Sequence, residues 1–142
     1  MSALMADTAL QLISAAREHA ASLEAPMAFA VVDAGGHPLA MLRMDGASLL
    51  AATTVVAKAR TAVYCRRPTH VIVERAGLFP EVWSSLVSTA VPPLLLSMGG
   101  FPLECAGEIV GGFASSGGSG EQDIEVSQQA LTVWTCIQEA GR

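Results

Sequence analysis

Lys58 has the clearest potential for chemistry, because it is a charged residue in a stretch rich in alanine and valine. Burial in such a stretch lowers the pKa of a lysine, and its amine can then act as a base or form an iminium. The alternative, which we favour, is that the ammonium extends to water or pairs with Asp45. The sequence leaves both interpretations open.

Four further charged residues complete a candidate catalytic set. A carboxylate can transfer protons, and an arginine can hold a substrate carboxylate. With Lys58 they would suit a cofactor-free enzyme that acts on a small organic acid or a ring-derived metabolite. For Asp33 we favour a structural role, since aspartates at turns commonly accept hydrogen bonds from nearby amides. The four residues are Asp33, Arg43, Glu121 and Asp123.

A glycine- and serine-rich segment, residues 116–123, leads into the last predicted helix. Ser119 and Gln122 have the spacing of a capping box, in which each side chain satisfies a free amide at the helix start. Free amides there can also hold an anion, but Glu121 and Asp123 would repel one. We therefore favour a capped helix. If this segment is functional, proton transfer by one of the two carboxylates fits better than anion binding.

The sequence gives little evidence of a metal site or of a hydrolase active site. None of the histidines, His19, His37 and His70, has a metal-ligand spacing to another histidine, a cysteine or a carboxylate, and His37 falls in a predicted turn. There is no Gly-x-Ser-x-Gly elbow and no Cys–His pair of familiar spacing, which excludes ordinary triad hydrolases. Cys65, Cys105 and Cys136 are widely spaced, so we expect buried free thiols in a reducing compartment.

Length and composition indicate one domain, residues 1–142, that assembles with copies of itself. The sequence is 51% hydrophobic and 15% charged, and a domain of this size cannot bury so much apolar material alone. The net charge of −5, with 8 basic residues, excludes nucleic acid and anionic membranes as partners. There is no pattern of a secretory signal and no apolar span of bilayer length, so a cytoplasmic location is expected.

The predicted elements are helices around antiparallel strands. Gly35-Gly36 separates two strand-like runs and supplies the positive φ angles of a tight hairpin turn. Segment 69–91 is ambiguous between helical turns and loop. Hairpin connections make the sheet antiparallel, with helices on its faces. We predict helices over 4–23, 47–64 and 119–139, and strands over 27–32, 39–44, 94–97, 101–105 and 108–115.

Several of these segments resemble the GlcG/HbpS family of heme-binding-like proteins. In the N-terminal half the matching segments are 30–39 (AVVDAGGHPL), 43–47 (RMDGA), 58–62 (KARTA) and 68–69 (PT). In the C-terminal half they are 99–103 (GGFPL), 107–111 (GEIVG), 116–118 (SGG) and 121–123 (EQD). They follow the family order over most of the chain.

The resemblance implies a profilin-like α/β (α+β) fold: a five-stranded antiparallel sheet, with the first and last helices on one face. It also implies a homo-oligomer that binds a small molecule, with heme as the first ligand to test. The sequence departs from the family where Gly-Val-Ser-Gly is replaced by residues 114–117 (ASSG), and in segment 69–97, which carries Trp83. Both departures would lie near the ligand pocket.

The pocket is expected beside two glycine-containing turns. For heme iron, His19 and His70 are the candidate histidine ligands, and Tyr64, Cys65 and Met98 are alternatives. A third hypothesis is an assembly module without a polar pocket. The candidate ligand-binding residues are Tyr64, Gly99, Gly100, Phe101, Ser116, Gly117 and Gly118.

Overall fold

A four-stranded antiparallel sheet organises the chain in the computed structural model, which describes residues 4–141. The strands lie side by side in the order β2-β1-β4-β3, so the two central strands are far apart in sequence. The elements are α1 (Ala6–Ser22), β1 (Ala28–Asp33), β2 (Pro38–Arg43), α2 (Leu49–Cys65), α3 (Thr69–Leu78), α4 (Pro80–Thr89), β3 (Gly100–Cys105), β4 (Glu108–Ser116) and α5 (Gly120–Ala140).

The β1–β2 hairpin forms as predicted. Gly36 has a φ of +84°, a backbone conformation that side-chain-bearing residues resist. The Asp33 carboxylate accepts hydrogen bonds from the amides of Gly35 and His37, both at 2.9 Å. This confirms that Asp33 stabilises its own turn.

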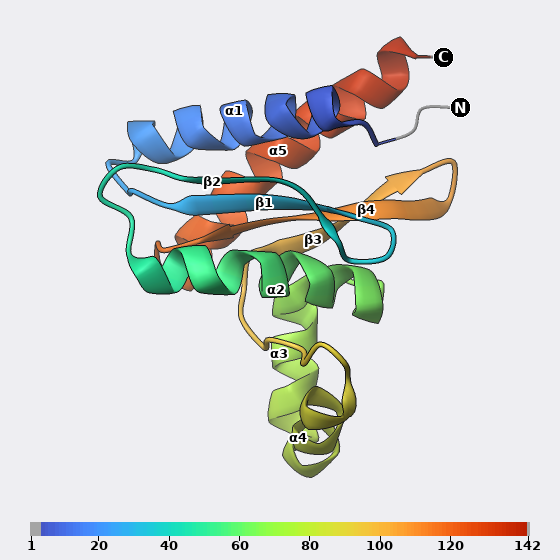
Figure 1. The fold of residues 1–142 in the computed structure, drawn as a ribbon. Coiled ribbons are helices and arrows are strands. Elements are labelled where there is room, and N and C mark those ends of the chain that lie inside the picture. Colours follow the sequence, from blue (N-terminus) through green and yellow to red (C-terminus); the bar gives the residue numbers. More distant parts are fainter. Residues whose placement is uncertain (1–3, 142) are drawn as a thin grey trace.

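Helices cover both faces of the sheet (Figure 1). α1 and α5 lie together on one face, and α2 lies alone on the other. One core gathers Leu12, Phe29 and Trp134 between α1, α5 and the sheet, and a second packs α2 against β1 and β4. Residues 28–32 of β1 are buried because both of its faces are covered, which explains the uninterrupted apolar run.

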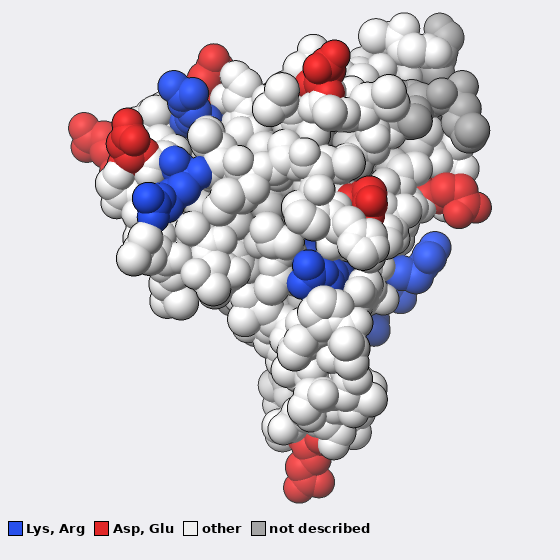
Figure 2. All heavy atoms as spheres, in the orientation of Figure 1, with Lys and Arg blue, Asp and Glu red and all other residues white. Residues whose placement is uncertain are grey.

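α3 and α4 project from the body of the molecule (Figure 1). Only Thr69 and Ile72 of α3 are buried, and no residue of α4 is. Leu78, Phe79 and Val82 are 71%, 61% and 56% exposed. In Figure 2 the projecting part is almost free of charged residues. The arm therefore carries several exposed apolar side chains with few charges beside them, and Leu49 and Leu50 at the start of α2 are similarly exposed.

The prediction of a fifth strand was wrong. Residues 4–141 contain four strands, because 94–97 is not a strand. Pro92 and Pro93 precede it without N–H groups, and the Leu95 amide donates to Thr61 Oγ1 at 2.9 Å instead of to a strand. The segment 69–91, which the sequence left ambiguous between helical turns and loop, contains the two helices α3 and α4.

Among the described residues, no helix combines the length and the apolar character that crossing a bilayer requires.

Candidate functional site

Lys58 is buried on the inner face of α2, with a side chain only 1% exposed. Its Nζ donates hydrogen bonds to the Ser115 carbonyl at 2.8 Å and to Asp123 Oδ2 at 3.0 Å. The prediction that Lys58 reaches water or pairs with Asp45 was therefore wrong. An ammonium has three donors, and these two bonds engage two of them.

Asp123 lies near the start of α5, where the capping box of Ser119 and Gln122 fixes the helix. Its Oδ1 accepts from the Gly118 amide at 2.9 Å. Burial raises the pKa of Asp123 and lowers that of Lys58, and the attraction between the two groups opposes both shifts. The shifts bring the two pKa values closer together, which reduces the free energy of moving a proton within the pair.

Lys58 and Asp123 both line a polar pocket. We call it the Lys58 pocket. It has a volume of about 370 Å³. Thr54 Oγ1 and Ser116 Oγ lie 3.0 Å apart in its wall. Thr54 precedes Lys58 by one helical turn, so both side chains are on the same face of α2. The lining residues are Ser48, Leu50, Ala51, Thr54, Lys58, Leu95, Ser97, Ser116, Gly117, Gly118 and Asp123.

Ser127 and Gly99 support the arrangement of Lys58 and Asp123. Ser127 Oγ donates to the Gly99 carbonyl at 2.7 Å, and its oxygen can accept from Ser115 Oγ, which lies 2.8 Å away. Gly99 has a φ of +108°, and a Cβ there would lie 2.7 Å from Asp123 Cβ. Gly99 thus permits the close approach of the strand to α5. Ser127 was not predicted from the sequence, which gives no local signal for it.

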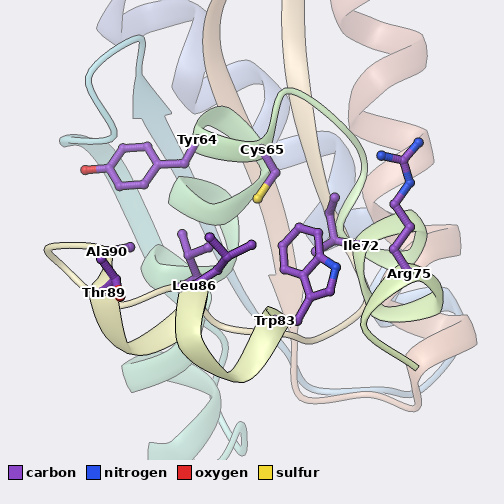
Figure 3. Close-up of a pocket in the computed structure, with 9 residues that line it drawn as sticks. Tyr64, Cys65, Ile72, Arg75, Trp83, Leu86, Thr89 and Ala90 are labelled. Atoms are coloured by element: carbon purple, nitrogen blue, oxygen red, sulfur yellow. The ribbon is translucent and has the colours of Figure 1, made fainter. Parts of the chain in front are cut away.

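A second cavity, of about 420 Å³, lies between α2, α3 and α4; we call it the arm cleft. Figure 3 shows the Cys65 sulfur directed into the cleft toward Trp83 and Leu86. Burial raises the pKa of the Cys65 thiol, so the thiol is protonated until something stabilises the thiolate. The lining residues are Tyr64, Cys65, Ile72, Arg75, Trp83, Leu86, Thr89, Ala90 and Leu94.

Polar groups of the arm cleft lie at its edge. The Tyr64 hydroxyl and the Arg75 guanidinium both point away from Trp83 in Figure 3. Tyr64 was predicted as a ligand-binding residue and does line the cleft. Arg75 and Leu86 were not predicted. The approximately helical spacing of Ile72, Arg75, Trp83 and Leu86 could have suggested two facing helices.

Of the candidate catalytic residues, the structure brings together only Lys58 and Asp123. Glu121 is exposed in the first turn of α5. The Asp33 carboxylate accepts a hydrogen bond within its own hairpin. Arg43 lines a separate hollow with Arg17 and Asp45.

The remaining predicted ligand residues are divided among several places. Ser116, Gly117 and Gly118 line the Lys58 pocket, whereas Gly100 donates its amide to Thr69 Oγ1 at 2.8 Å. Phe101 packs against the His70 ring, with 5.6 Å between ring centroids.

The two candidate histidines are in different environments. His70 Nδ1 is buried and has no hydrogen-bond partner among residues 4–141. His19 Nε2 lies 2.7 Å from Glu125 between α1 and α5. Within the described part of the chain, no three histidine, cysteine or carboxylate side chains gather as a metal site would require.

Comparison with known proteins supports a heme-associated family. The family model described as "Haem degrading protein HbpS-like" matches residues 4–132. Protein GlcG of Escherichia coli is 37% identical over 101 residues, which cover 70% of this chain and 71% of GlcG. The corrinoid adenosyltransferase PduO of Salmonella typhimurium is 34% identical over 125 residues, which cover 85% of this chain but only 36% of PduO.

Solved structures agree with the fold. The structure titled as a PduOC:heme complex has a TM-score of 0.79 at 30% identity, and covers 93% of this chain and 95% of that chain. A double mutant of HbpS from Streptomyces reticuli has a TM-score of 0.83 at 28% identity, and covers 94% and 88%.

Proposed function

Because this chain belongs to the HbpS-like family, we propose that it is a small-ligand-binding protein whose ligand is heme, held in the arm cleft. The observation that carries the proposal is the apolar cleft into which the Cys65 sulfur is directed. A structural relative is titled as a heme complex. The adenosyltransferase activity in the name of PduO is not part of the proposal, since this chain matches about a third of that protein.

The cleft residues fit the requirements of heme. Heme needs apolar walls, an axial ligand and a cation near its propionates. Trp83, Ile72 and Leu86 supply walls, Cys65 supplies a ligand atom, and Arg75 supplies a cation at the edge. Bound heme would supply a redox-active iron. Because burial keeps the Cys65 thiol protonated, ligation through it would release a proton.

Hemin titration of the purified protein tests the proposal. We expect a Soret band that saturates at one heme per chain, with quenching of Trp83 fluorescence. A linear rise of absorbance past that ratio would indicate partitioning and would refute heme binding. Trp134 is buried between α5 and the sheet and bonds the Glu104 carbonyl, so the variant Trp83→Phe identifies which indole is quenched.

The iron ligand is tested separately from binding. Cys65→Ser should remove the spectral signature of thiolate ligation, whereas Cys136→Ser, at an exposed free cysteine of α5, should not. An unchanged Cys65→Ser spectrum would reject Cys65 and direct the test to Tyr64→Phe, His70→Ala, His19→Ala and Met98→Leu.

We also infer that the protein forms homo-oligomers in a reducing compartment such as the cytoplasm. The exposed apolar residues of the arm support assembly, since large apolar patches are rare on monomers. The three free cysteines support the compartment, as thiols persist where disulfides are kept reduced.

A further inference from the structure

Lys58 is the only lysine in the sequence, and the other seven basic residues are arginines. Arginine forms stronger bidentate pairs with carboxylates and cannot lose its proton in proteins, whereas lysine can. The only lysine side chain of the sequence is thus buried beside a carboxylate, in the wall of a cavity.

We propose that the Lys58 pocket is an imine-forming site for a small, neutral hydroxyaldehyde or hydroxyketone. The site is distinct from the arm cleft and nothing in the heme proposal depends on it. The cavity volume of about 370 Å³ admits a molecule of a few carbon atoms.

The lining of the pocket selects the ligand class. Its hydroxyl groups come from Ser48, Thr54, Ser97 and Ser116, and they can bond the hydroxyls of a ligand. Among residues 4–141, the charged residues of the lining are Lys58 and Asp123, and they neutralise each other. This described part of the chain places no second cation there to hold a carboxylate, so a neutral carbonyl compound is favoured over an oxo acid.

Lys58 and Asp123 can together supply the proton transfers that imine formation requires. The Lys58 ammonium gives a proton to Asp123, 3.0 Å away, and the free amine attacks the carbonyl carbon, forming a C–N bond. A proton moves from that nitrogen to the former carbonyl oxygen, giving a carbinolamine. Asp123 then returns its proton to this hydroxyl, the C–O bond breaks and water leaves. The products are an iminium at Lys58 and an ionised Asp123, so the buried charges are the same before and after.

Reductive trapping of the imine with cyanoborohydride tests the proposal on the intact chain. Folded protein is incubated with glycolaldehyde and sodium cyanoborohydride at neutral pH, and intact mass is followed. Each trapped adduct adds the mass of the carbonyl compound less one oxygen atom. Since Lys58 is the only lysine, the N-terminal amine is the only other primary amine and serves as an internal reference. Trypsin does not cleave at an alkylated lysine, so modification preserves peptide 44–60.

Comparison with the urea-unfolded chain separates a reactive lysine from a structural one. An ordinary lysine is about 99.96% protonated at pH 7, and each unit of lowered pKa raises the free-amine fraction about tenfold. We expect Lys58 to be trapped more than about tenfold faster in the folded chain than in the unfolded chain, relative to the N-terminal amine. A buried structural pair predicts the reverse, and slower trapping on folding would overturn the proposal.

Two further comparisons test the ligand class and the role of Asp123. Pyruvate should be trapped more slowly than glycolaldehyde, relative to the N-terminal amine; equal or faster trapping would refute the neutral class. Asp123→Asn should slow trapping at Lys58 at least tenfold, whereas Glu139→Gln, at an exposed carboxylate of the same helix, should leave it unchanged. Unfolding of Asp123→Asn, checked by circular dichroism, would leave the wild-type comparison decisive.

Discussion

Replacement of Lys58 by methionine should destabilise the protein more than simultaneous removal of both charges. In Lys58→Met, Asp123 is an unpaired buried carboxylate that keeps only its bond from the Gly118 amide. Breaking a buried ion pair in this way costs about 3–5 kcal/mol. For a chain of this size that corresponds to a fall in Tm of about 6–20 °C.

The matched control is the double variant Lys58→Met/Asp123→Asn. Asparagine retains an oxygen for the Gly118 amide and carries no charge. The double variant still lacks the hydrogen-bond donor to the Ser115 carbonyl, and this loss costs about 1–3 kcal/mol. Urea unfolding followed by circular dichroism should therefore find the double variant more stable than Lys58→Met by about 2 kcal/mol. A single variant as stable as the double variant would show that the carboxylate is not confined in a dry site.

The difference in stability between Lys58→Met and the double variant should depend on pH. Burial holds the pKa of Asp123 in the folded protein above its ordinary value of 3.8, and removal of Lys58 removes an interaction that lowers it. Between 3.8 and the folded pKa, the folded state of Lys58→Met binds more protons than the unfolded state. Its stability thus rises as pH falls through that window. The deficit relative to the double variant should shrink from about pH 7 to about pH 4, and a deficit that grows would contradict the reasoning.

Four other outcomes are expected. Hemin affinity should rise with pH, by up to about tenfold per unit below the pKa of Cys65, because the thiol must lose a proton to ligate iron, and Cys65→Ser should flatten this dependence in a spectroscopic titration. Gly99→Ala should lower stability by about 2–4 kcal/mol, measured by urea unfolding, because its Cβ would overlap Asp123 at a positive φ. Phe79→Glu should shift the protein toward monomer in analytical ultracentrifugation, since Phe79 is 61% exposed on the arm. Thr61→Val should cost about 1–3 kcal/mol in thermal unfolding, because the Leu95 amide loses its acceptor.

Local features of the fold could be predicted because they are encoded by neighbouring residues. The Gly-Gly pair at 35–36 predicted the hairpin, in which Gly36 has the positive φ, and Ser119 with Gln122 predicted the start of α5. The strand predicted over 94–97 was wrong because the Leu95 amide bonds the Thr61 side chain of α2 instead of a neighbouring strand. An apolar run indicates burial, but it does not reveal whether backbone partners are present.

The site could be predicted residue by residue but not as a pair. Lys58 and Asp123 were each recognised as candidates, the first from its apolar surroundings and the second from its place at a helix start. Their contact spans 65 positions in the sequence and depends on α2 and α5 meeting at β4. No local pattern encodes such a contact, so Asp45, nearer in sequence, was wrongly chosen as the partner of Lys58.

The segment 94–97 forms a wall shared by the two cavities. Leu94 lines the arm cleft, whereas Leu95 and Ser97 line the Lys58 pocket, and the Leu95 amide is anchored to α2 through Thr61. Since α2 also carries both Lys58 and Cys65, a ligand in one cavity that shifts this segment changes the shape of the other. If a ligand in one cavity displaced this segment, heme and a pocket ligand would alter each other's affinity by the same factor. The two proposed sites are therefore separate in chemistry but share one structural element.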